Sequence, residues 1–399
     1  MKFLSSFEYN SRRSAIFSSR GMAASSQPEA TAAGVKILRR GGNAADAAVA
    51  MAAALQVTQP CSTGLGGDCF CLYYSAAEKR VYAMNGSGRS PGKLNLTLLQ
   101  DQGFEKEIPS YHAHTVTVPG APAGWVDTVE RFGSLPMSSI LEPAIDLAEN
   151  GFPVGQLTAN WWGRGAEKQL ALYPHGGELM INGRGPRPGE VFKNLGLAAV
   201  LRTMAEEGAA PFYSGWIAER VVSAVQQEGG VLSMADLAQH TTEWIDPISV
   251  DYKGVTVWEC PPNGQGIAAL IGLNILSQFD LRAVDRCTRY HLLIESMRLA
   301  FADAGAYVAD PAISPVPVED LLSKSYAANR AAMIDRNVRI PQVDPGSFAP
   351  AATGGDTVYF STADRDGNGC SFINSNYMGF GTGIVPQGCG FSLQNRGKG

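Results

Sequence analysis

The first sixty residues have a helical pattern of apolar positions. Residues 28–38 carry apolar side chains at helical spacing, and Gly41-Gly42 follows as a helix stop. Residues 44–57 are almost continuous Ala, Val, Met and Leu, a composition that predicts a helix buried between layers. Asn43 stands directly before this segment and is a favourable N-cap for it.

Strand-like runs come next, and helical spacing then returns. Residues 69–74 and 80–84 are β-rich and flank the charged turn Glu78-Lys79, which predicts two adjacent strands. Apolar spacing predicts further helices over residues 140–150, 195–207, 217–228 and 290–307. Strand–helix–strand alternation is missing, so the pattern favours a layered α+β fold. No repeat or low-complexity linker divides the sequence, and we expect one structural domain.

The end of the chain changes character abruptly. Residues 338–355 are rich in Pro, Gly and Ala, which predicts an exposed loop. Residues 357–362 and 370–377 are β-rich, and the Asp- and Gly-containing stretch 364–369 separates them. Turn residues of this kind between two β-rich runs predict a hairpin.

Composition narrows the possible partners. The formal net charge is −5 and no block of like charges occurs, which argues against a nucleic acid or an anionic membrane and favours a small molecule. Residues 1–22 lack the apolar core of a signal peptide, and no run of about twenty apolar residues follows, so we expect a cytoplasmic protein without a membrane anchor. The seven cysteines are dispersed and lack the spacing of a metal site, so we expect buried free thiols and no metal.

Thr357 is the candidate nucleophile. A threonine hydroxyl is a weak nucleophile until a base removes its proton, and a free α-amine on the same residue can serve as that base. This arrangement requires a backbone cut between Asp356 and Thr357, at the end of the Gly-containing loop. The plainer alternative is that Thr357 only begins an edge strand, and spacing alone favours that alternative.

Several blocks of the sequence, in order, resemble those of the γ-glutamyltransferase (glutathione hydrolase) family. They are residues 41–50, 58–68, 118–120, 261–266, 295–311, 354–359 and 380–385. The resemblance covers nearly the whole chain and is closest to the glutathione hydrolase-like proenzyme branch.

The resemblance implies a four-layer αββα sandwich of the N-terminal-nucleophile hydrolase type. It implies a precursor that cleaves itself between Asp356 and Thr357, with residues 1–356 as the large-subunit region and 357–399 as the start of the small-subunit region. Thr357 would attack a γ-glutamyl amide such as glutathione and pass the acyl group to water or an amine. No cofactor is implied.

The same resemblance assigns three binding residues. Arg89 takes the place of the arginine that binds the donor α-carboxylate, and the alternative is a solvated loop cation. Ser375 matches a hydroxyl that positions the nucleophile, and the alternative is an ordinary strand serine. Asn376 lies one step from the position of a family asparagine, which falls on Tyr377.

Two departures from the family pattern keep other functions open. Arg396 stands where typical members carry groups that hold the donor α-ammonium, and its charge is wrong for that role. An acylase for a β-lactam side chain or for poly-γ-glutamate is therefore an alternative. Only 42 residues follow Thr357, which is shorter than the family small subunit. We therefore expect an incomplete small-subunit portion, with an inactive truncated family member as a further alternative.

Overall fold

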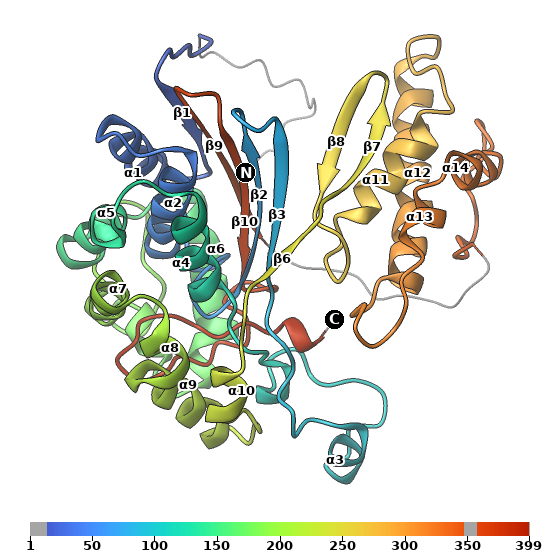
Figure 1. Cartoon of the computed structure of the whole chain (residues 1–399). Helices are drawn as coiled ribbons and strands as arrows, with labels where there is room; N and C mark the ends of the chain where they lie inside the picture. Colours follow the sequence, from blue (N-terminus) through green and yellow to red (C-terminus); the bar gives the residue numbers. More distant parts are fainter. Residues whose placement is uncertain (1–13, 347–356, 399) are drawn as a thin grey trace.

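The computed structural model describes residues 14–346 and 357–398, and its centre is a six-stranded antiparallel sheet (Figure 1). In the order of the sheet, the strands are β1 (Gly21–Ala24), β9 (Val358–Asp364), β10 (Gly369–Ser375), β2 (Asp68–Ser75), β3 (Arg80–Gly86) and β6 (Glu243–Ile245). The predicted hairpin is confirmed as β9 and β10. The alternative of an edge strand after Thr357 is wrong, because β9 lies between β1 and β10.

Helices pack on one side of this sheet, at the left of Figure 1. Every residue of α2 is buried, as its continuous apolar sequence predicts, and α2 packs between α1 and α5 and against β9 and β10. Asn43 caps α2 in a reciprocal capping box with Asp46. The helices on this side are α1 (Pro28–Arg39), α2 (Ala44–Thr58), α4 (Ala121–Phe132), α5 (Met137–Asn150), α6 (Gln156–Lys168), α7 (Leu195–Glu207), α8 (Ala210–Ser214), α9 (Trp216–Gln227) and α10 (Met234–Ala238).

A second, two-stranded sheet lies on the other side, backed by its own helices (Figure 1). Its strands are β7 (Ile248–Tyr252) and β8 (Val255–Glu259), and its helices are α11 (Ile267–Leu276), α12 (Arg286–Tyr307), α13 (Val318–Leu321) and α14 (Lys324–Ala331). These helices share a hydrophobic core that is separate from that of the large sheet. The order helix, sheet, sheet, helix confirms the α+β fold and the layering expected of the αββα sandwich.

Short elements complete the fold. They are α3 (Leu96–Asp101), the two-stranded pair β4 (Phe152–Pro153) and β5 (Val191–Phe192), and the 3-10 helices η1 (Ala113–Thr115), η2 (Leu170–Leu172), η3 (Gly176–Leu179) and η4 (Arg396–Lys398). Within the described ranges, no helix combines the length and apolar character needed to span a bilayer.

The ends of one helix and one strand, and the burial of one cysteine, differ from the predictions. The last long helix begins at Arg286, four residues before the predicted start, because the side chain of Asp285 accepts hydrogen bonds from the first-turn amides. The predicted strand 370–377 ends at Ser375, because Tyr377 adopts a left-handed φ of 74° that interrupts the extended chain. Six cysteines are buried as expected, whereas Cys287 in the first turn of α12 is exposed.

Candidate active site

Two of the predicted site residues meet at one end of the large sheet. The side-chain oxygens of Thr357 and Ser375 lie 3.1 Å apart and share a hydrogen bond. Thr357 is exposed and directly precedes β9, whereas Ser375 is buried at the end of β10. The structure thus brings an accessible hydroxyl and a fixed hydroxyl together. Asp356, the other residue of the predicted cleavage site, lies outside the described residues.

The Gly-rich turn before β2 packs tightly under this strand end. A Cβ atom on Gly67 would lie 2.1 Å from the carbonyl oxygen of Ser375, so only glycine fits there. Asn376, the third predicted residue near the nucleophile, is 1% exposed and has its side chain against Gly64 and Gly67. Its Oδ1 atom has no hydrogen-bond partner in the described part of the chain.

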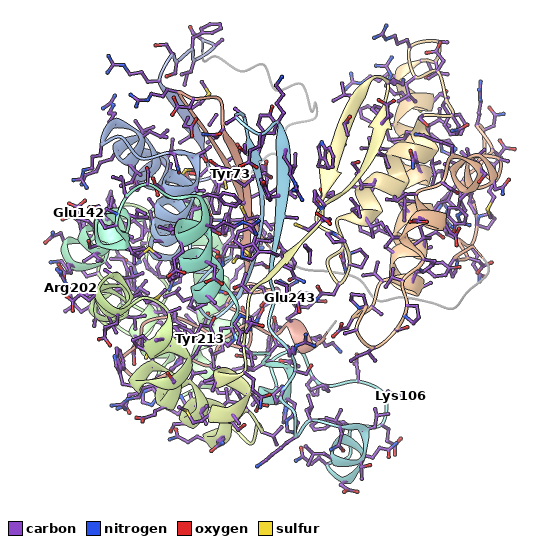
Figure 2. All side chains as sticks on the ribbon, viewed as in Figure 1. Tyr73, Lys106, Glu142, Arg202, Tyr213 and Glu243 are labelled. Atoms are coloured by element: carbon purple, nitrogen blue, oxygen red, sulfur yellow. The ribbon has the colours of Figure 1, made fainter. Side chains whose placement is uncertain are left out.

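Arg89 lies in the loop that follows β3 and forms two ion pairs. Its guanidinium is 3.1 Å from the carboxylate of Glu243, labelled in Figure 2, and 3.5 Å from that of Asp310. All three side chains are substantially exposed, and such surface pairs contribute only about 0–1 kcal/mol each. These pairs therefore hold the Arg89 side chain only weakly.

Asp68 connects the Arg89 loop to the strand end, and the sequence analysis did not identify it. It begins β2 directly opposite Ser375 in the sheet register. Its Oδ1 accepts hydrogen bonds from the backbone amide of Gly88 at 3.1 Å and from Nε2 of Gln394 at 2.8 Å. The signal in the sequence was a carboxylate placed between a Gly-rich turn and a buried strand, where an unpaired charge is costly.

The opposite side of the Asp68 carboxylate binds Arg396. The Nε atom of Arg396 lies 3.2 Å from Oδ2 of Asp68, and its guanidinium stands 4.9 Å from the centre of the Tyr377 ring. Burial raises the pKa of Asp68, while the charge of Arg396 and the hydrogen bonds from Gln394 and Gly88 act in the opposite direction. Asn395 fixes the same segment, because its Oδ1 accepts a hydrogen bond from the backbone amide of Met378 at 3.1 Å.

A family model described as gamma-glutamyltranspeptidase matches residues 30–399. The chain belongs to this family. The glutathione hydrolase-like YwrD proenzyme of Bacillus subtilis is 39% identical over 373 residues, which cover 92% of this chain and 69% of that protein. The glutathione hydrolase proenzyme of Escherichia coli is 33% identical and the acylase ACY 1 proenzyme of Pseudomonas sp. 34% identical, each over 94% of this chain.

Solved structures of similar proteins extend the match to the fold. A cephalosporin acylase from Bacillus halodurans has a TM-score of 0.90 at 42% identity, over 100% of this chain and 73% of that one. The γ-glutamyltranspeptidase of Helicobacter pylori has a TM-score of 0.78 at 28% identity, over 85% of this chain and 100% of that one. The chain spans between 66% and 69% of the length of the three related proenzymes.

The γ-glutamyltranspeptidase family is an enzyme family, and several related proteins are proenzymes. Membership therefore confirms an N-terminal-nucleophile hydrolase fold and supports autoprocessing into subunits. The roles predicted for Thr357, Arg89, Ser375 and Asn376 stay predictions, because the family match does not test single residues.

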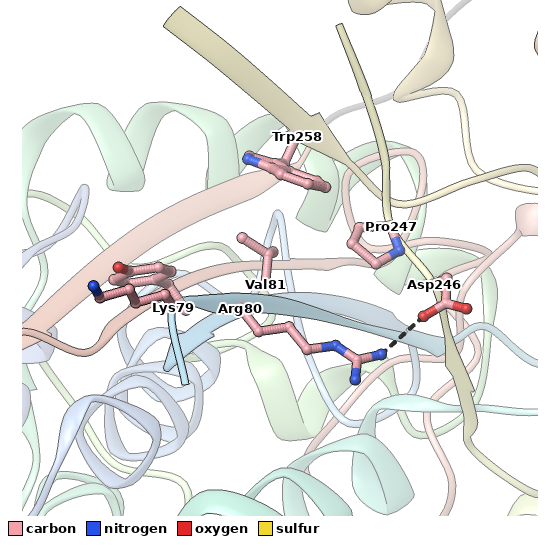
Figure 3. Close-up of a pocket in the computed structure, with 7 residues that line it drawn as sticks. Lys79, Arg80, Val81, Asp246, Pro247 and Trp258 are labelled. Atoms are coloured by element: carbon pink, nitrogen blue, oxygen red, sulfur yellow. Dashed lines mark hydrogen bonds and ion pairs between the residues drawn. The ribbon is translucent and has the colours of Figure 1, made fainter. Parts of the chain in front are cut away.

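One pocket of the described structure is not lined by Thr357. It has a volume of about 560 Å³ and lies between β3 and β8, with Trp258, Pro247 and Val81 among its lining residues (Figure 3). The Arg80–Asp246 ion pair, at 3.2 Å, forms one side of it. Arg80 begins β3, whereas the loop that carries Arg89 follows the other end of that strand, and no predicted site residue lines the pocket.

Proposed function

We propose that the chain is an autoprocessing amide hydrolase or acyltransferase that acts on γ-glutamyl-type amides such as glutathione through Thr357. The hydrogen bond between Thr357 and Ser375 at an accessible strand end is the observation that carries this proposal. In it, residues 1–356 form the large-subunit region and residues 357–399 the start of the small-subunit region of one structural domain.

The first reaction is the cut at Asp356. The Oγ1 atom of Thr357 attacks the carbonyl carbon of Asp356, the peptide C–N bond breaks, and the hydroxyl proton moves to the released amine. The resulting ester between Asp356 and Thr357 is hydrolysed by water. This leaves Asp356 as a carboxylate and Thr357 with a free α-amine next to its hydroxyl.

The second reaction uses that amine as the base. It takes the Thr357 hydroxyl proton while the oxygen attacks the carbonyl carbon of the donor amide. The amide C–N bond breaks, the leaving amine receives the proton, and an acyl ester forms on Thr357. Attack by water releases the acid, and attack by an acceptor amine gives a new amide. Either step returns the proton to the Thr357 hydroxyl.

The neighbouring residues have distinct roles in this proposal. The Ser375 hydroxyl, 3.1 Å from that of Thr357, holds the nucleophile in place. Arg89 exchanges its exposed partners for the donor carboxylate, which suits the bidentate geometry of a guanidinium. Asn376, whose Oδ1 atom is buried without a hydrogen-bond partner among the described residues, is the third substrate-binding residue of this proposal.

Intact mass and a denaturing gel test the proposal. The purified chain is expected to give two fragments that meet at Asp356/Thr357, and Thr357→Ala is expected to abolish them. Thr357→Ser is the matched control, because it keeps a hydroxyl and should still be cleaved. A full-length chain that hydrolyses a γ-glutamyl amide would contradict the amine mechanism. A chain with neither cleavage nor hydrolysis would support the inactive alternative.

A second candidate is an acylase for another acyl group. The observation in its favour is Arg396, a cation at the strand end where a γ-glutamyl donor would place its ammonium group. The similar proteins include the acylase ACY 1 proenzyme of Pseudomonas sp. and the cephalosporin acylase of Bacillus halodurans. Rapid hydrolysis of glutathione by the processed chain would argue against this candidate.

A further inference from the structure

We propose that Cys71 and Cys370 form a redox-dependent disulfide between the large-subunit and small-subunit regions. A small-molecule disulfide oxidises the two thiols to this bond, and a reductant opens it again. The bond itself needs only the two cysteines. Its role as a link between subunits rests on the proposed function, because it requires the cut between Asp356 and Thr357.

The contact between the two sulfurs is the first argument. Both cysteines are free thiols, and their Sγ atoms lie 3.4 Å apart. A disulfide bond is about 2.05 Å long, so the sulfurs must approach by about 1.4 Å to form it. Rotation of the two side chains can supply a movement of this size, and the strands need not change partners.

The sheet register is the second argument. Cys71 lies opposite Phe372, and Cys370 lies opposite Tyr73. Residues two positions apart on a strand share a face, so the two cysteines are diagonal neighbours on the same face of the sheet. The hydrogen bonds between β2 and β10 therefore hold the two sulfurs next to each other for as long as the sheet is intact.

The position of the pair relative to the proposed cut is the third argument. Cys71 lies in β2, within residues 1–356, and Cys370 lies in β10, within residues 357–399. After scission the hydrogen bonds between these two strands join two separate polypeptides. A bond between the two sulfurs would add a covalent connection at the same place.

Cys260 is a competing partner for Cys71. Its Sγ atom contacts backbone oxygens, at 3.8 Å for Cys71 and 3.9 Å for Met84. These are contacts of a thiol with the main chain, whereas Cys370 contacts the Cys71 sulfur itself. The geometry therefore favours Cys370, and a bond between Cys71 and Cys260 would stay within the large-subunit region.

The reaction is an exchange with a small-molecule disulfide. The Cys71 thiolate attacks one sulfur of the reagent, the S–S bond of the reagent breaks, and one small thiol leaves with the proton that Cys71 lost. The Cys370 thiolate then attacks the Cys71 sulfur of this mixed disulfide and releases the second small thiol with its own proton. Two protein thiols are oxidised, and one reagent disulfide is reduced to two thiols.

Burial sets the conditions for this exchange. The side chains of Cys71 and Cys370 are 1% and 2% exposed. The contact with Cys370 and burial both raise the pKa of the Cys71 thiol, so it stays protonated and unreactive in the closed sheet. The reagent therefore reaches the pair when β2 and β10 separate locally, or before the sheet has formed.

The plainer alternative is that the two thiols only fill space in the core, as buried cysteines commonly do. In that case an oxidant leaves both of them as thiols. The state of the two sulfurs after oxidation therefore separates the two roles.

Non-reducing electrophoresis of the processed chain tests the inference. The chain is treated with hydroxyethyl disulfide, which has no amide that the site could cleave, and its remaining thiols are then alkylated. We expect the two fragments to migrate as one band, and to separate when a reductant is added. Cys71→Ala and Cys370→Ala should each abolish the joined band. Cys287→Ala, which removes the exposed cysteine, is the matched control and should keep it.

Peptide mapping of Thr357→Ala provides a readout that does not depend on cleavage. The reagent is added to this folded variant and, separately, during its refolding from urea. Digestion without reductant should give one linked pair of peptides, containing Cys71 and Cys370, whose mass is two hydrogens below the sum of the two.

Three results would overturn the inference: alkylation of both cysteines after both treatments, a bond between Cys71 and Cys260, or mixed disulfides with the reagent alone. The proposed function is judged separately. The linked peptides in a wild-type chain that is never cut would contradict the proposed function and leave the disulfide in place. Normal cleavage without the linked peptides would do the reverse.

Discussion

Two buried aspartates, one in each half of the molecule, pair with arginines in different ways. In the helical unit behind the small sheet, Arg330 lies 2.8 Å from Asp303, and their side chains are 4% and 0% exposed. Arg330 also donates to the backbone oxygen of Asp344 at 3.0 Å, and Asp303 accepts from the backbone amide of Gly346 at 3.0 Å.

The pair at the end of the large sheet is less complete. Arg396 makes one contact with Asp68 through Nε, and its side chain is 35% exposed. A buried pair whose hydrogen-bonding groups are all satisfied within the protein has a structural role. The pair of Asp68 and Arg396 instead leaves the guanidinium open to solvent on one side.

The largest expected effect concerns the complete pair. Arg330→Met should lower the free energy of unfolding by about 3–5 kcal/mol, because it leaves the buried carboxylate of Asp303 without its cation. Urea denaturation monitored by circular dichroism measures this change. A loss below about 1 kcal/mol would contradict the distinction between the two pairs.

A smaller, pH-dependent effect is expected for the open pair. Arg396→Gln should lower the free energy of unfolding by about 1–2 kcal/mol at pH 7, where it removes a hydrogen bond to a charged group. Burial raises the pKa of the Asp68 carboxyl above its value in the unfolded chain, so the folded state binds the carboxyl proton more tightly. The free energy of unfolding therefore falls as the pH rises from the unfolded pKa to the folded one.

The sign of the change with pH follows from the same shift. Loss of Arg396 raises the pKa of Asp68 further, so the destabilisation should shrink as the pH falls and Asp68 becomes protonated. Urea denaturation of both proteins between pH 4 and 7 measures this trend. A loss that stays constant over the range would show that Asp68 is not the group through which Arg396 acts.

The smallest effect is expected for a pair exposed on both sides. Arg80 and Asp246 are 58% and 91% exposed, so Arg80→Gln should change the free energy of unfolding by no more than about 0.5 kcal/mol. The same denaturation assay with and without 0.5 M salt provides the measurement. A loss of unfolding free energy comparable to that of Arg396→Gln would mean that the contribution of an ion pair to stability does not depend on its burial.

Much of the fold is predictable from local sequence signals. The apolar run of α2 predicted its complete burial, and Asn43 predicted its N-cap. The hairpin signal placed β9 and β10 side by side, and this pairing brings Thr357 to Ser375. These features depend on residues close together along the chain, where spacing and turn chemistry are informative.

The ion pairs could not be predicted in the same way. Asp68 and Arg396 are 328 residues apart, and their contact depends on how the last segment crosses the end of the sheet. The partners of Arg89 come from β6 and from the loop after α12. No local pattern encodes such contacts, because they arise only when separate layers pack together.

The central place of the hairpin has a consequence for assembly. Its two strands bond to β1 on one side and to β2 on the other, so both neighbours come from earlier in the chain. Scission before Thr357 would therefore yield two polypeptides interlocked by a continuous hydrogen-bonded ladder, and they would stay associated until the whole protein unfolds. Synthesis as one chain allows β9 and β10 to pair with β1 and β2 before the backbone is cut.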